Sequence, residues 1–237
     1  MKKKFFTIEQ EARTADVYIF GYIVSDKWYD GEVSAKSFLE EIAALDVDVI
    51  RVHIDSYGGE VSEGWAMYNA LLEHPARIET YADGFVCSAA LYPFLAGDSR
   101  HASILSAFYL HEVSSGAWGY AAELRAAAEE AEKLTDIGIN AFVERAGLTR
   151  EKVKELMEGE TWLSPEEALE LNIATAIIQD KSPGLQQSAK KAVMQKVFQR
   201  QEIKPAAAPK IEEQPNEGNN PKSENSMFEL FAGFFNA

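Results

Sequence analysis

The sequence predicts an α/β domain in which much of the strand pairing is parallel. Short β-branched and apolar runs alternate with stretches whose apolar residues recur at helical spacing, an order typical of parallel sheets. Hydrophobic residues make up 46% and charged residues 26% of the 237 residues, as in a soluble globular protein with a large core. The alternation stops near residue 180, so we expect a folded domain over 1–180 and a separate tail over 181–237.

The first half of the domain is expected to contain three strands and three helices. Strands are predicted where β-branched and apolar residues run together, and helices where apolar residues recur every three or four positions. The strands are 17–24 (VYIFGYIV), 48–55 (DVIRVHID) and 77–82, and the helices are 34–45, 61–74 and 87–96. Ser34 has the side chain of an N-cap, Pro75 ends the second helix, and Gly97 follows the third.

The second half continues the alternation with one unusually long helix. Its elements are a strand at 103–111, helices at 120–146, 149–159 and 165–171, and a short strand at 173–178. The helix at 120–146 is rich in alanine and glutamate, and Gly138 interrupts it only mildly. We therefore expect a long helix that continues through this glycine.

Charge and cysteine content restrict the class of protein. The net charge is −15, and because residues 181–237 hold 8 Lys+Arg against 6 Asp+Glu, the excess of acid lies in the domain. An acidic body is a poor candidate for binding nucleic acid. The single cysteine, Cys87, excludes an internal disulfide and fits a reducing compartment. The basic start is too short for a signal-peptide core, and no stretch approaches about 18 apolar residues. We expect a cytoplasmic protein without membrane contact.

The tail has a different character from the domain. Five of the eight prolines fall in 181–237, and residues 204–226 have the composition of a disordered linker. A basic helix is possible at 186–203, and the chain ends in a hydrophobic cluster at 227–235 (MFELFAGFF). This cluster fits a docking peptide or a segment that orders in an assembly, and equally a cloning remnant or part of a truncated larger chain.

Three short segments carry residue types suited to serine hydrolysis. They are 54–59 (IDSYGG), 84–90 (GFVCSAA) and 108–112 (FYLHE), each at an end of an apolar run. Acyl transfer by serine needs a hydroxyl nucleophile, an imidazole base and backbone N–H groups for the oxyanion. Ser88 and His111 supply the first two, although a serine at such a position is more often a helix cap, and Val86 and Ala90 exclude a G-x-S-x-G elbow. A lysine base is disfavoured because residues 37–132 contain no lysine.

Taken together, the segments resemble the proteolytic subunit of Clp protease (ClpP) from residue 17 to 178. Residues 54–64 are similar to the family's strand and Gly-Gly turn, with Tyr57 where proline is usual, and 82–90 to its nucleophile segment. Residues 100–111 are similar to the strand that carries the catalytic histidine, and 117–134 to the protruding handle helix. Residues 160–168 (ETWLSPEEA) match the segment that carries the triad acid.

The resemblance implies a fold and a set of roles. The fold would be the ClpP/crotonase-like spiral of β-β-α units with a long handle helix. Ser88 would attack the substrate, His111 would act as base and then acid, and Glu160 would orient His111. The backbone N–H groups of Gly58 and Ala89 would form the oxyanion hole. The chain would form a homo-oligomeric ring, single or stacked in two layers, with its sites facing an inner chamber.

Two neighbours of the implied triad need separate interpretation. The housekeeping enzymes carry aspartate where this chain has Glu160, and Glu158 is the alternative acid, with Glu160 preferred by register. Cys87, next to Ser88, is expected to serve core packing, because adjacent residues at such a turn point apart.

The predicted function is an ATP-independent serine endopeptidase that needs no cofactor and no metal. The Glu-Thr-Trp-Leu variant resembles the phage and prophage head-maturation branch, which implies capsid or scaffold proteins as substrates. No G-x-x-x-x-G-K-[ST] loop occurs, so any ATP-driven unfolding would come from a partner ATPase, whose docking stays open. The alternatives are a crotonase-type enzyme that polarises an acyl-CoA thioester, and an inactive structural ring or scaffold subunit.

Overall fold

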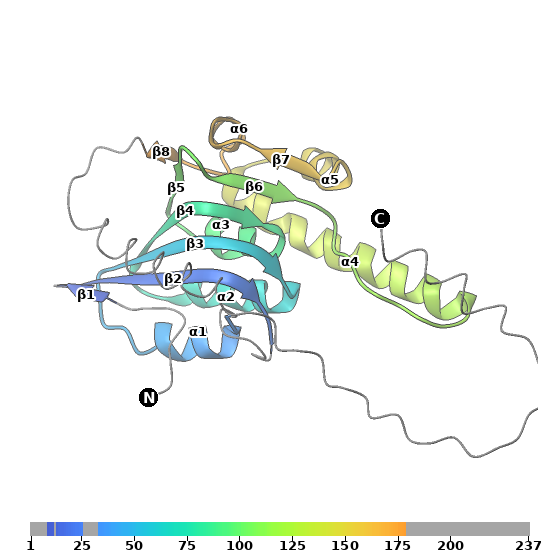
Figure 1. The fold of residues 1–237 in the computed structure, drawn as a ribbon, viewed down its shortest axis with the longest axis horizontal. Coiled ribbons are helices and arrows are strands. Elements are labelled where there is room, and N and C mark those ends of the chain that lie inside the picture. Colours follow the sequence, from blue (N-terminus) through green and yellow to red (C-terminus); the bar gives the residue numbers. More distant parts are fainter. Residues whose placement is uncertain (1–8, 12, 26–32, 179–237) are drawn as a thin grey trace, which may run out of the picture. The chain divides into compact units, whose positions relative to one another are not determined.

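The computed structural model describes residues 9–11, 13–25 and 33–178, so the predictions for the tail at 181–237 lie outside the described residues. The described strands are β1 (Glu9–Glu11), β2 (Thr14–Ile23), β3 (Val49–Gly59), β4 (Arg77–Cys87), β5 (Ser99–Ser103), β6 (Ala107–Leu110), β7 (Thr161–Leu163) and β8 (Ala176–Ile178) (Figure 1). The helices are α1 (Ala35–Ile42), α2 (Val61–Glu73), a 3₁₀ turn at Ser88–Ala90, α3 (Leu91–Leu95), α4 (Ala121–Ala146), α5 (Arg150–Glu158) and α6 (Pro165–Glu170).

Most of the sheet is parallel, as the alternation of strands and helices predicts. The described strands follow the order β1-β2-β3-β4-β5-β8, and β6 lies between the end of β4 and β7. The pairs β2–β3, β3–β4, β4–β5, β4–β6 and β5–β8 are parallel, whereas β1–β2 and β6–β7 are antiparallel. The carboxyl ends of β3, β4 and β6 therefore meet at one edge of the sheet.

The strand predicted at 103–111 is confirmed only over Ala107–Leu110 (β6), because a turn separates this strand from β5, which ends at Ser103. β5 ends at Ser103, and the N–H of Ser106 donates to the carbonyl of Ser103 at 2.9 Å, which closes a turn before β6 begins. Ile104 and Leu105 lie on this turn and are exposed. β5 then pairs with the first half of β4 and β6 with its last residues.

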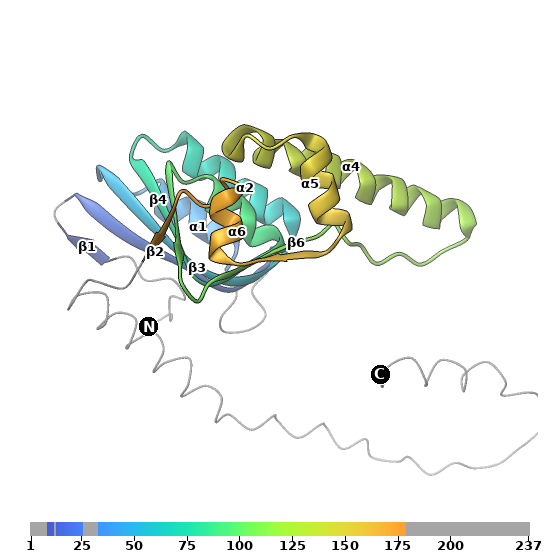
Figure 2. The ribbon, with the colours of Figure 1, turned by 90° about the horizontal axis from the view of Figure 1, so that it is seen from above.

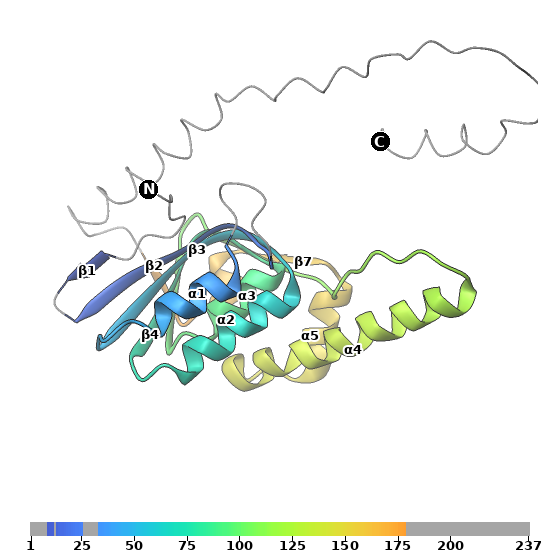
Figure 3. The same cartoon turned by 90° about the horizontal axis from the view of Figure 1, so that it is seen from below.

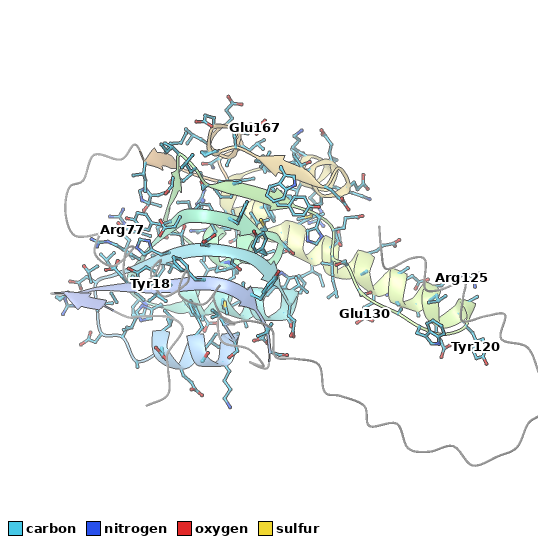
Figure 4. The ribbon with its side chains drawn as sticks, viewed as in Figure 1. Tyr18, Arg77, Tyr120, Arg125, Glu130 and Glu167 are labelled. Carbon is cyan, nitrogen blue, oxygen red and sulfur yellow. The ribbon has the colours of Figure 1, made fainter. Side chains whose placement is uncertain are left out.

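Helices α1, α2 and α3 pack against one face of the sheet (Figures 2 and 3). The core between the two layers contains fully buried apolar side chains from both, among them Ile19, Ile54, Leu71 and Phe94. The predicted cap of the first helix is confirmed, since the N–H of Ser37 donates to the Ser34 hydroxyl at 3.4 Å. The opposite face of the sheet carries half-buried polar and aromatic side chains, such as Tyr18 on β2 (Figure 4).

A buried arginine holds the C-terminal part of the domain to the sheet. Arg100 on β5 is 4% exposed and donates to the carbonyls of Gly97, Arg145, Asn172 and Ile173 at 2.8–3.1 Å. Burial lowers the pKa of this guanidinium, but it still presents its rigid fork to backbone oxygens. These bonds join the base of α4 and the segment before β8 to the core.

Helix α4 extends well beyond the sheet (Figures 1 and 2). Its first three turns are largely exposed, and Trp118 and Tyr120 just before it are 95% and 87% exposed. Figure 4 shows Tyr120, Arg125 and Glu130 along this projecting part. The segment that leads from β6 to α4 is tied to this helix, because the N–H of Val113 donates to the hydroxyl of Thr135 at 2.9 Å. Within the described part of the chain, no helix combines the length and the apolar character needed to cross a membrane.

Candidate active site

The three segments singled out in the sequence lie side by side at the carboxyl edge of the sheet. Ser56 on β3 pairs with Val86 on β4, and Cys87 on β4 pairs with Tyr109 on β6. The residues that follow these pairs therefore leave the sheet next to one another. Crevices at the carboxyl ends of parallel strands are where α/β folds place their functional groups.

Ser88 occupies a strained backbone position between β4 and α3. Its φ is +54°, a value that few residues with a side chain adopt. Two glycines make room for it: a Cβ on Gly58 would lie 2.8 Å from Ser88 Cβ, and one on Gly64 would lie 2.6 Å from the carbonyl oxygen of Ala89. Cys87, rather than Ser88, is the N-cap residue of the turn, so Ser88 is not a helix cap.

The structure brings His111 and Ser88 together. His111 follows the last residue of β6, and its Nε2 lies 2.8 Å from Ser88 Oγ. In the tautomer with the proton on Nδ1, the hydroxyl of Ser88 donates to Nε2, which is the arrangement that allows the imidazole to remove the hydroxyl proton. The distance is the one that a serine nucleophile and an imidazole base would need.

The pair opens onto a cavity of about 240 Å³. Its apolar floor comes from Leu91, Tyr92, Phe142 and Met157. Its other lining residues are Gly59, Glu60, Val61, Ser88, Ala89, His111, Glu112, Val113 and Ser114. Gly138 leaves room for Tyr92 in this floor, because a Cβ at Gly138 would lie 2.2 Å from the Tyr92 hydroxyl. Helix α4 continues through this glycine, as predicted. The cavity offers an apolar recess next to the Ser88 hydroxyl.

The register between β6 and β7 places Glu160 near His111 without contact. Leu110 pairs with Thr161, so one further step of the antiparallel register sets His111 opposite Glu160. Glu160 instead has φ +46°, and no hydrogen bond or ion pair joins it to His111 among the described residues. The charge of Glu160 contributes to the raised pKa of the Tyr109 hydroxyl, after the larger effect of burial.

The alternative acid, Glu158, is engaged elsewhere. It is the last residue of α5, and its carboxylate forms an exposed ion pair with Lys154 at 3.5 Å. Glu158 lies three residues before β7, whereas Glu160 directly precedes this strand, which pairs with the strand that leads to His111. The geometry favours Glu160 over Glu158 as the acid nearest to the imidazole.

The two predicted oxyanion donors differ in their surroundings. Ala89 follows Ser88 in the first turn of the 3₁₀ segment, where backbone N–H groups lack helical partners, and it borders the cavity. The N–H of Gly58 instead donates to the hydroxyl of Ser56 at 3.0 Å, and Gly58 is not among the residues that line the cavity. The next residue, Gly59, borders the cavity with Ser88 and Ala89.

Cys87 is a packing residue, as predicted. It is 2% exposed, and burial together with the nearby charge of Asp55 raises the pKa of its thiol to about 11. At neutral pH the side chain is therefore the uncharged thiol and lacks nucleophilic character.

The matching family model is that of Clp protease, and it covers residues 8–181. This range contains the whole of the described sheet and the Ser88–His111 pair. The chain belongs to the Clp protease family. The proteolytic subunit of Dehalococcoides mccartyi strain BAV1 is 30% identical over 132 residues, which are 55% of this chain and 66% of that protein. The subunit of Deinococcus radiodurans is 30% identical over 150 residues, 61% of this chain and 74% of that protein.

A solved Clp protease structure shows the same fold. A mutant of ClpP1 from Listeria monocytogenes superposes with a TM-score of 0.61 at 22% identity, over 71% of this chain and 92% of that one. The predicted ClpP-like α/β fold is thereby confirmed.

An aromatic row next to the candidate site was missed in the sequence. It consists of Tyr57, Phe85, Trp162 and Tyr109, with ring centroids 4.9, 6.0 and 4.6 Å apart in that order, and Tyr109 lies 5.4 Å from the His111 ring. Tyr57, Phe85 and Trp162 are 55%, 37% and 52% exposed. Each ring lies one to three positions from a site residue along the chain, and that proximity is the signal that could have identified them.

Proposed function

We propose that the protein is a serine endopeptidase with Ser88 as nucleophile, His111 as general acid and base, and Glu160 as the acid that orients His111. Membership of the Clp protease family implies a serine peptidase. The observation that carries the proposal is the 2.8 Å contact between Ser88 Oγ and His111 Nε2, at a backbone-strained serine beside a cavity of about 240 Å³.

The reaction follows from these positions. Ser88 Oγ attacks the peptide carbonyl carbon while His111 Nε2 takes its proton, and a tetrahedral intermediate forms. His111 then gives the proton to the leaving amine, and the C–N bond breaks to leave an acyl-enzyme on Ser88. A water molecule, deprotonated by His111, attacks the ester and releases the second product, with the proton returned to Ser88.

The oxyanion of the intermediate needs backbone donors at the cavity. The N–H of Ala89 meets this requirement, since it follows Ser88 at the start of a helical segment. For the second donor we propose Gly59 in place of Gly58, because Gly58 already donates to Ser56 and only Gly59 borders the cavity. A residue without Cβ is required there, as a Cβ on Gly59 would lie 2.0 Å from the carbonyl oxygen of Ile23.

The substrate is proposed to be a protein or peptide with a large apolar side chain beside the scissile bond. The floor of Leu91, Tyr92, Phe142 and Met157 suits such a side chain, and the aromatic row offers further apolar surface to an extended chain. Capsid or scaffold proteins of a phage or prophage are the proposed natural substrates, on the resemblance of the Glu160–Leu163 segment. We place the protein in the bacterial cytoplasm as a homo-oligomeric ring that acts without ATP, since the sequence carries no phosphate-binding loop.

Two other functions explain less of the site. A crotonase-type enzyme would use paired N–H groups and would have no need of the contact between Ser88 and His111. An inactive ring or scaffold subunit would have no need of a strained serine at the rim of a cavity. The serine peptidase accounts for both features.

A fluorophosphonate probe tests the proposal directly. The full chain should be labelled at Ser88, as located by mass spectrometry, and should hydrolyse fluorogenic peptides. Ser88→Ala should keep its assembly and lose about 10³-fold or more in kcat/KM, the effect of removing a nucleophile. The control is Cys87→Ala, a buried neighbour that should keep both labelling and turnover. A Ser88→Ala preparation with full activity would exclude the mechanism.

A further inference from the structure

Strand β4 bulges just before it reaches the proposed nucleophile. Ile54 on β3 pairs with Ala82 on β4. The next pair is Ser56 with Val86, so β4 has three residues at a point where β3 has one. We call these three residues, 83–85, the β4 bulge. Bulges beside functional sites bend the strand and redirect the side chains that follow.

The β4 bulge is also where β4 changes its partner strand. The residues before it pair with β5, whereas from Phe85 onward β4 pairs with β6, the strand that leads to His111. Cys87 pairs with Tyr109. Ser88 and His111 follow this pair by one and by two residues. The shape of the β4 bulge therefore determines where Ser88 lies relative to His111.

Two side chains on the same face of β3 hold the β4 bulge. His53 Nδ1 lies 2.9 Å from the carboxylate of Asp83, the first residue of the bulge. The N–H of Phe85, the last residue of the bulge, donates to Asp55 Oδ1 at 2.9 Å. Gly84 leaves room for the second carboxylate, because a Cβ at Gly84 would lie 2.4 Å from Asp55 Oδ1.

We infer that Asp55 is a positioning residue, whose carboxylate fixes the end of the β4 bulge and thereby holds the Ser88 hydroxyl within reach of His111. Only two residues lie between Phe85 and Ser88, so a shift of the bulge passes directly to the attacking oxygen. In this role Asp55 acts on the reaction through the backbone alone. The inference rests on the proposed function, since the roles of Ser88 and His111 are part of it.

Two substitutions of Asp55 separate the hydrogen bond from the charge. Asp55→Ala removes the acceptor for the Phe85 N–H, and kcat on a fluorogenic peptide should fall about tenfold or more because the attacking oxygen is misplaced. KM should stay within about twofold, since the recess that receives the substrate side chain is intact. Asp55→Asn should keep kcat within about twofold, because an amide oxygen accepts the same hydrogen bond.

Gly84→Ala is an independent variant that keeps the carboxylate. The three atoms nearest to its added Cβ all belong to Asp55, so the substitution should displace the carboxylate from Phe85 and lower kcat as Asp55→Ala does. In the Asp55→Ala background, Gly84→Ala should lower kcat by less than about twofold more, because both changes break one interaction. Fully additive losses would overturn the inference. Gly84→Ala also serves as the second variant should Asp55→Ala fail to fold.

A further measurement does not depend on turnover. The chain has 4 histidines, so the ring signals of ¹³C-labelled protein are few enough to assign by NMR. In Asp55→Ala, the His111 signals should move toward those of Ser88→Ala, in which the 2.8 Å contact with the hydroxyl is absent. In Asp55→Asn they should stay where they are in the unmodified chain. The same movement in a protein without peptidase activity would support the inference about position and reject the proposed function.

Asp98→Ala is the matched control. Asp98 also accepts a hydrogen bond from a backbone N–H of β4, that of Ile78 at 3.0 Å, but at the end of the strand away from Ser88. It should leave kcat and the His111 signals unchanged. An equal loss of kcat in Asp98→Ala would overturn the inference, because any weakening of β4 would then suffice. Unchanged His111 signals in Asp55→Ala would also overturn it, and the peptidase activity of the full chain would stand.

Discussion

At the scale of single residues, the sequence predicted which polar groups come together better than it predicted the groups that surround them. Ser88 and His111 follow from residue type and from their place at the ends of apolar runs, and the structure brings them to 2.8 Å. The sequence could not separate Gly58 from Gly59 as the oxyanion donor, because both are glycines at the end of the same strand. Only the hydrogen bond to Ser56 and the cavity lining distinguish them. The pairing of Tyr109 with Trp162 could not be found, because it depends on an antiparallel register that no local pattern shows.

Substitution of the two candidate acids provides the test at this scale. Glu160→Gln should lower kcat by about 10²-fold or more, since the amide can place the His111 proton on the nitrogen that must accept one from Ser88. Glu158→Gln is the matched control, and only its exposed ion pair with Lys154 is lost. Steady-state kinetics on one fluorogenic peptide compares them. Small and equal effects would remove Glu160 from the triad.

At the scale of elements, helices were easier to predict than strands. Ser34 and Thr149 each accept a hydrogen bond from a backbone N–H at the start of their helices, a local signal that the sequence displays. Two of the strands that were missed, β1 and β7, have three residues each and depend on neighbours in other parts of the chain. The turn at Ser103–Ser106 was hidden because Ile104 and Leu105 continue an apolar run across it.

The projecting part of α4 is the element whose surroundings within one chain are incomplete. Helices depend on packing for most of their stability, yet the first turns of α4 and the exposed Leu124 are covered by little of the described chain. We therefore expect light scattering to show a multi-subunit particle at micromolar concentration. Leu124→Lys should reduce the assembled fraction, whereas Arg125→Ala beside it should not. A monomeric wild-type protein with peptidase activity would contradict this prediction.

At the scale of the whole molecule, composition predicts a boundary between a folded domain and a tail near residue 180. The Clp protease match ends at residue 181. The alternation of strands and helices was sufficient to predict a largely parallel sheet. It could not show that β4 pairs with two successive strands, because that arrangement depends on a turn rather than on periodicity.

The tail after residue 180 should be dispensable for the chemistry. The residues that we place in the site lie between Gly59 and Glu160, and the composition of 181–237, with five prolines and a polar linker, offers too little apolar area to offset the entropy of ordering. A chain ending at residue 185 should therefore hydrolyse short peptides with the kcat/KM of the full chain. An increase would indicate that the hydrophobic segment at 227–235 occupies the site in the full chain and competes with substrate. The control is the full chain with its four phenylalanines in that segment changed to serine, which should match the truncated chain in either case. A truncated protein that is soluble and assembled but inactive would show that residues beyond 185 help to build the active site, and the domain would then extend past the boundary proposed here.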